Sequence, residues 1–190
     1  MSYTTVALQK TYLGITTSTD DTLLTALIAR AQAIIDAYCQ RTFEAASNTS
    51  KTFDVERDAD GDLLYLDEDL ASINSITNGD GVVVTTAQYT TEPRNRTPYY
   101  AIKILDSASI YWTYSTTPEN AITISGKWAY SVAAPDDIVH CTLRLAAYLY
   151  RQRDNAADLD RAVIAGNSTI LPAQLPSDIK TILAPYRRLV

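Results

Sequence analysis

The chain has 190 residues, a length that suits one domain or one domain with a large insertion. Hydrophobic residues make up 46% and charged residues 20%, an ordinary globular mixture that can bury a core. The formal net charge of −6 argues against DNA gripped in a basic groove, because such binding depends on Lys and Arg neutralising phosphates. That charge does not exclude a protein that merely surrounds DNA.

The chain opens without the basic and apolar regions of a signal peptide, and no apolar run approaches the length of a membrane span. We therefore expect the protein to fold in a cytosol, where the sequons at Asn48 and Asn167 are accidental. Cys39 and Cys141 are the only cysteines. They are best interpreted as reduced, buried small hydrophobes rather than as a disulfide.

Two helices are predicted near the N-terminus, over residues 4–13 and 20–39. Gly14 is a suitable residue to end the first. Ser18 or Thr19 can cap the second, and Asp20 and Asp21 place negative charge where the helix dipole favours it. Apolar residues recur along the second helix at helical spacing. They are Leu23, Leu24, Leu27, Ile28, Ala31, Ile34, Ile35 and Tyr38.

The middle of the chain is rich in Thr, Val, Ile and Tyr and predicts six to eight short strands. The expected strands are Lys51–Glu56, Leu63–Leu66, Ile73–Ile76, Val82–Val84, Tyr100–Leu105, Ser109–Tyr114 and Ala121–Ser125. The run Asn78–Gly81 is a strong hairpin signal, because Asn and Gly tolerate positive φ. The polar stretch Thr90–Pro98 is expected to be a loop.

The last third predicts a helix over 135–152, a loop-rich stretch over 154–175 and a short helix from Pro176 that Pro185 interrupts. The two long helices should pack on each other, with Cys39 and Cys141 near one another. The fold class is therefore α+β. We expect a helical bundle from residues 1–48 and 131–190, ending in a C-terminal arm, with an inserted antiparallel β region at 49–130.

Three patterns in the sequence are candidates for chemical sites. Asp58, Asp60 and Asp62, followed by the acidic residues 67–69, favour a solvated hairpin turn, with calcium binding as the alternative. His140 is the only histidine, and no Cys/His spacing provides the ligands of a metal site. The sequence also has no Gly-x-Ser-x-Gly nucleophile elbow. Gly79 and Gly81 belong to the hairpin rather than to a phosphate loop. We expect no catalytic residues, no metal and no cofactor.

The chain has 13 tyrosines, many of them in the β region. Tyrosine without a basic groove favours packing and protein contact over base stacking. The chain ends in a locally basic, amphipathic segment, Tyr186, Arg187, Arg188, Leu189 and Val190. This segment is either a frayed end or an arm that docks on a partner.

The order of these motifs resembles the head–tail connector, or adaptor, proteins of long-tailed bacteriophages. The resemblance covers most of the chain, which departs from the compact family form by its long, Tyr-rich middle. The residues that carry it are Leu13-Gly14, Asp20-Asp21, Leu23-Leu24, Leu27-Ile28, Ala31, Ile34-Ile35, Tyr38-Cys39, Arg41-Thr42-Phe43, Gly126-Lys127-Trp128, Pro135-Asp136-Asp137-Ile138, Leu183 and Tyr186-Arg187-Arg188.

The resemblance implies a structural virion protein without catalysis, assembled in the host cytoplasm as a dodecameric ring. The ring would lie in the neck, below the portal protein, and join the capsid to the tail through other neck and tail-completion proteins. Double-stranded DNA would pass through its lumen without specific binding. By the same analogy, Tyr186, Arg187, Arg188, Leu189 and Val190 would contact the portal.

One alternative function was considered. Tyr111, Trp112 and Trp128 suggest a carbohydrate- or receptor-binding β module carried on a helical stem of a virion protein. An enzyme is disfavoured by the lack of catalytic motifs.

Overall fold

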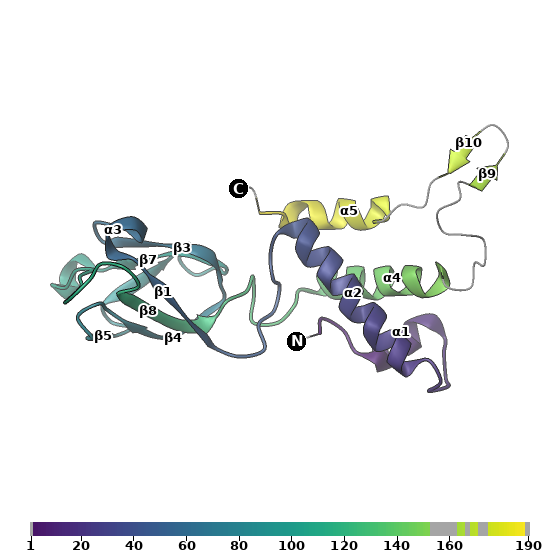
Figure 1. Cartoon of the computed structure of the whole chain (residues 1–190), viewed down its shortest axis with the longest axis horizontal. Coiled ribbons are helices and arrows are strands. Elements are labelled where there is room, and N and C mark those ends of the chain that lie inside the picture. Colours follow the sequence, from purple (N-terminus) through teal and green to yellow (C-terminus); the bar gives the residue numbers. More distant parts are fainter. Residues whose placement is uncertain (1, 153–162, 166–167, 171–174, 189–190) are drawn as a thin grey trace. The chain divides into compact units, whose positions relative to one another are not determined.

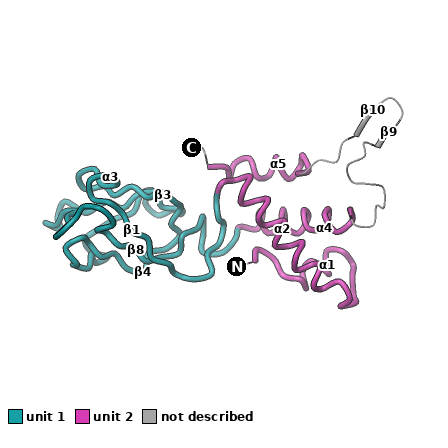
Figure 2. Tube along the Cα trace, in the orientation of Figure 1, with its two compact units in different colours: residues 1, 41–134 teal, residues 2–40, 135–190 magenta. Residues whose placement is uncertain are grey.

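A computed structural model describes residues 2–152, 163–165, 168–170 and 175–188. The chain divides into two compact units, coloured separately in Figure 2. A helical unit comprises residues 2–40 and 135–190, and a β-rich unit comprises residues 41–134. The chain therefore passes from the helical unit into the β-rich unit and back again.

The helical unit contains α1 (Val6–Leu13), α2 (Asp21–Cys39), α4 (Asp136–Gln152) and α5 (Ser177–Leu183), followed by the 3-10 turn η2 (Ala184–Tyr186). Thr5 caps α1 by accepting a hydrogen bond from the Leu8 N–H, and Gly14 ends it with φ 72°. The expected N-cap of α2, Ser18 or Thr19, was wrong by one or two positions. Asp20 occupies the N-cap position, but its carboxylate accepts a hydrogen bond from the Tyr150 hydroxyl instead of capping the helix.

The two long helices pack on each other, as expected (Figure 1). The buried face of α2 repeats every three or four residues and comprises Leu24, Ile28, Ala31, Ile35 and Cys39. The matching face of α4 comprises Ile138, Cys141, Thr142, Leu145, Ala146 and Ala147. On α5, Ile179 and Leu183 are fully buried. Side chains of this size are each worth about 1.5–3 kcal/mol on burial, so the stripe is the main stabilisation of these helices.

By length and composition, α2 could cross a membrane, which the sequence analysis did not anticipate. Its mean hydropathy reaches 1.2 over 18 residues. This is weak evidence for a span, because the core helix of a soluble protein passes the same test. One face of α2 is buried in the helical unit, and Asp36 on the same helix accepts a hydrogen bond from the Tyr3 hydroxyl at 2.7 Å.

The β-rich unit holds two antiparallel four-stranded sheets. The first has the order β1 (Thr49–Phe53), β8 (Ile122–Lys127), β4 (Ser72–Thr77) and β5 (Val83–Val84). The second has the order β2 (Ala59–Asp60), β3 (Leu63–Leu70), β7 (Tyr99–Ile104) and β6 (Tyr89–Glu92). Both sheets share one apolar core, which includes Phe53, Leu64, Leu70, Ile76, Ile102, Ile104, Ile122 and Ile124.

Three expectations for the β region, two strands and one loop, differ from the structure. The first strand ends at Phe53, and Val55–Asp58 form the short helix α3. The first residues of the expected loop 90–98 belong to β6, where Thr90 pairs with Lys103. Residues 109–113 form no strand. The buried Asn78 side chain instead takes up backbone hydrogen bonds of Tyr111 and Thr113. The neighbouring Tyr114 makes one isolated bridge with Gly79.

The remaining short elements are the 3-10 turn η1 (Asp106–Ala108) and the antiparallel pair β9 (Val163–Ala165) and β10 (Ser168–Ile170). The pair β9–β10 falls in the expected loop-rich stretch 154–175, most of which lies outside the described residues.

Candidate partner-binding surfaces

The described part of the C-terminal arm lies on the helical unit. The Tyr186 hydroxyl donates to Asp137 Oδ2 at 3.0 Å. The Arg187 guanidinium lies 5.2 Å from the centre of the Tyr38 ring. The Arg188 N–H donates to the carbonyl oxygen of Cys39 at 2.9 Å. Three successive residues thus contact the ends of α2 and α4, while Leu189 and Val190 lie outside the described residues.

The end of α2 explains why the arm lies there. The last carbonyls of a helix have no partner within the helix. Gln40 ends α2 in the left-handed conformation, with φ 53°, and the Arg188 N–H then satisfies the Cys39 carbonyl. A cation near a helix C-terminus is favoured by the helix dipole. The arm is therefore positioned by backbone chemistry, and Arg187 remains exposed.

A second candidate surface is a groove in the β-rich unit. It has a volume of about 380 Å³ and lies between the β4–β5 turn and residues 109–113. Its lining comprises Asn78, Asp80, Val82, Val84, Ser109, Ile110, Tyr111, Trp112 and Thr113. We call this feature the β4–β5 groove. A smaller hollow of about 190 Å³ adjoins it and shares Ser109, Ile110 and Tyr111 with it.

Asn78 holds the two walls of the groove together. Its side chain is buried, with only 4% of its surface exposed. The amide nitrogen donates to the Tyr111 carbonyl at 2.8 Å, and the amide oxygen accepts from the Thr113 N–H at 3.2 Å. The same oxygen accepts from the Gly79 N–H at 3.0 Å. A buried amide that is satisfied on both sides fixes the segment 109–113 against the turn.

The acidic balance of the chain resides in the β-rich unit. Residues 41–134 contain seven Lys or Arg and thirteen Asp or Glu, which gives this unit a formal charge of −6. The rest of the chain balances nine basic with nine acidic residues. Any electrostatic attraction to a basic partner therefore originates from the β-rich unit.

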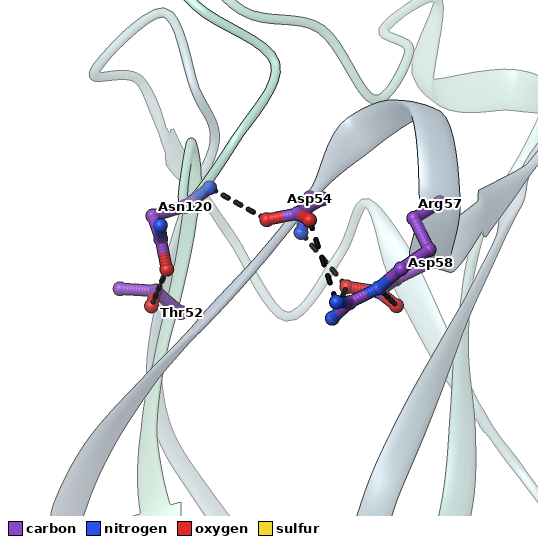
Figure 3. Close-up of polar contacts among 5 residues, drawn as sticks. All are labelled: Thr52, Asp54, Arg57, Asp58 and Asn120. Atoms are coloured by element: carbon purple, nitrogen blue, oxygen red, sulfur yellow. Dashed lines mark hydrogen bonds and ion pairs between the residues drawn. The ribbon is translucent and has the colours of Figure 1, made fainter.

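Asp58, the first residue of the acidic run that suggested calcium, is engaged by protein contacts (Figure 3). Asp58 accepts from Arg57 Nε and from the Asp54 N–H, both at 2.8 Å. The hydrogen bond from Arg57 lowers the pKa of Asp58, while partial burial opposes the shift. Asp54 accepts from the Asn120 N–H at 2.7 Å, and Asn120 bonds to Thr52. Among the described residues, no group of three or more His, Cys, Asp or Glu side chains could hold a metal ion.

The other residues singled out in the sequence have structural surroundings. His140 is exposed, and its ring meets Tyr12 edge-on at 6.5 Å. Cys39 and Cys141 are buried and do not form a disulfide, and burial raises the pKa of Cys141 to about 11. Trp112 and Trp128 are core residues whose indole N–H groups donate to the carbonyls of Asp62 and Thr49. The two indole side chains are thus largely buried, whereas Tyr111, the third residue behind the β-module alternative, is 71% exposed.

Comparison with known proteins assigns the chain to a family. A family model described as head completion protein matches residues 2–189. The chain belongs to the head completion protein family. This is a structural family, so the protein is not an enzyme.

Two solved structures share the fold of this head completion protein. One is a chain from the neck of an empty gene transfer agent particle, computed with C6 symmetry, with a TM-score of 0.57 and 16% identity. The other is a chain from the virion of a native gene transfer agent particle, with a TM-score of 0.59 and 16% identity. Each match covers 97% of this chain and 89% of the other. No curated protein matches the sequence.

The β4–β5 groove of this head completion protein could not be predicted from its sequence. The pattern Asn78–Gly81 predicts the turn but gives Asn78 no further role. Its amide bonds to residues 33 and 35 positions further along the chain, and no local pattern encodes such a contact. The available signal was weaker: the apolar Val82 directly follows the turn residue Gly81.

Proposed function

We propose that this head completion protein assembles as a dodecameric ring in the neck of a phage-like virion, between the portal protein and the next neck proteins. The family match over residues 2–189 carries the proposal. The likeness to a chain from a gene transfer agent neck supports the location, and twelve copies are compatible with the C6 symmetry used for that neck.

DNA passage through the ring follows from the same proposal. A basic wall would hold the phosphates of double-stranded DNA, whereas a wall of like charge repels them. The formal charge of −6 on the β-rich unit and the balanced charge of the remainder support a lumen that does not bind DNA.

The C-terminal arm is the proposed portal contact. Tyr186, Arg187 and Arg188 lie in fixed positions on the helical unit, and Leu189 and Val190 follow them. Tyrosine and arginine are the side chains that most often dominate binding energy at protein interfaces. Because the backbone of Arg188 is held by Cys39, the arm can dock with little further ordering.

Electron microscopy of the purified protein mixed with its portal protein tests the proposal. Rings stacked on the portal are expected, and absence of the protein from purified virions would contradict it. Arg187→Ser should weaken docking at least several-fold, since it removes an exposed cation while retaining the backbone. Arg30→Ser, at an exposed position on α2, is the matched control. Equal docking by both variants would remove Arg187 from the interface.

We also infer that the β region, with the expected bounds 49–130, folds as an insertion. The two ends of the β-rich unit pair with each other, because the Tyr130 N–H donates to Thr42 O and the Ala134 N–H donates to Glu44. Residues 41–134 expressed alone should therefore unfold cooperatively. A fragment without a thermal transition, measured by circular dichroism, would show that it needs the helical unit.

A further inference from the structure

We propose that the β4–β5 groove is the docking site for a segment of the next neck protein, in which one apolar side chain is flanked by Lys or Arg. The inference rests on the proposed neck function and names the chemistry of one partner. Three features of the groove support the inference: exposed apolar side chains, an acidic rim and walls that are already fixed.

The groove is surrounded by apolar side chains that solvent reaches. Tyr111 is 71% exposed, Val82 54% and Val83 57%. Tyr114, whose backbone bridges Gly79 at the same turn, is 39% exposed. Sites for small molecules enclose most of their ligand. Here the two most exposed apolar side chains of the lining, Val82 and Tyr111, stand at the open side of the groove, which fits a protein segment that inserts one side chain.

The rim of the groove is acidic. Asp80 lines the groove itself, and Asp62 and Asp106 line the adjoining hollow. Lys103 lies 3.7 Å from Asp106 and offsets part of this charge. Asp80 retains its carboxylate at the surface while one oxygen accepts from the Val82 N–H at 2.9 Å. The β-rich unit as a whole carries a formal charge of −6. Its acidic rim therefore selects a segment with cations on both sides of the apolar residue.

The walls need no rearrangement before a segment binds. Asn78 ties the turn to Tyr111 and Thr113, and the Ser115 N–H donates to the Gly79 carbonyl at 3.2 Å. At Gly79, a Cβ atom would lie 2.4 Å from the Thr113 carbonyl oxygen, so the two walls approach as closely as backbones can. A preformed groove loses little conformational entropy on binding, which favours a specific contact.

The test uses particles in which variants replace the wild-type protein. The double variant Val82→Ser with Tyr111→Ser removes two exposed apolar side chains of the groove lining but no backbone hydrogen bond. Tyr100→Ser is the control, because Tyr100 is 55% exposed on β7 and does not line the groove. Circular dichroism should show the same melting temperature for both variants to within a few degrees.

Electron microscopy then counts heads that carry the protein and heads that carry a tail. For the double variant, we expect the protein to stay on the heads while the tailed fraction falls about tenfold or more, as for loss of an interface anchor. Tyr100→Ser should give wild-type counts. A normal tailed fraction in the double variant overturns the inference. Absence of the wild-type protein from heads would instead refute the proposed neck function.

A binding measurement checks the chemistry of the segment. The full chain is titrated with the peptide Lys-Lys-Leu-Lys-Lys while the Trp112 indole N–H is followed by NMR. That group donates to the Asp62 carbonyl between the two hollows and reports on both. Binding should weaken on Asp80→Asn, which keeps the acceptor for Val82, and with added salt. Equal binding of Glu-Glu-Leu-Glu-Glu or Lys-Lys-Gly-Lys-Lys overturns the assigned chemistry.

Discussion

Replacing Asn78 with alanine tests whether one buried amide holds the β4–β5 groove together. The substitution removes the hydrogen bond that the amide donates to the Tyr111 carbonyl and the two that it accepts from the N–H groups of Thr113 and Gly79. The strand pairing of β4 with β5 uses backbone groups only and stays intact. The segment 109–113 loses its attachment to the turn, so the groove should open.

The expected cost follows from these three contacts. A typical hydrogen bond contributes about 1 kcal/mol net, and a polar group left unsatisfied costs about 1–3 kcal/mol. Solvent in the groove can reach the freed groups of residues 111 and 113 and lowers the penalty. We expect the free energy of unfolding to fall by about 2–4 kcal/mol, which corresponds to at least about 8 °C in melting temperature for a unit of this size.

Urea denaturation followed by tryptophan fluorescence measures the loss, because Trp112 lies in the affected wall. Asn74→Ala is the matched control: the same side chain is truncated on β4, the strand that Asn78 directly follows, but Asn74 is exposed. The control should lie within about 0.5 kcal/mol of wild type. Identical unfolding midpoints for the two variants would refute the role assigned to Asn78.

Three further predictions concern single positions. Gly126→Ala should destabilise the first sheet by about 3 kcal/mol or more in urea denaturation, because the new Cβ would lie 2.2 Å from the Ser72 carbonyl oxygen. Arg57→Gln should raise the pKa of Asp58 toward 3.8 in an NMR titration. The small stabilisation from this pair is present above pH 3.8 and is lost as pH falls through the lowered folded pKa. Cys141, with a pKa raised to about 11, should react with a thiol reagent at pH 8 only after unfolding.

Much of the fold follows from local pattern. The apolar stripe of α2 and the Pro135-Asp136-Asp137 start of α4 predicted both long helices, since the periodicity of 3.6 residues is written in adjacent turns. Alternating β-branched residues predicted most strands in the same way. The strand expected at 109–114 was wrong, because its backbone bonds to the Asn78 side chain rather than to a neighbouring strand.

The sequence by itself determined the fold class, the family and the acidic charge of the β-rich unit, because composition, periodicity and motif order are all linear properties of the chain. Tertiary structure decided where the candidate partner-binding surfaces lie. It placed Arg188 on the last carbonyl of α2, 149 positions earlier in the chain, and formed a groove from a turn and a distant segment. Such contacts depend on packing between residues far apart in sequence, and no local pattern of residues specifies them.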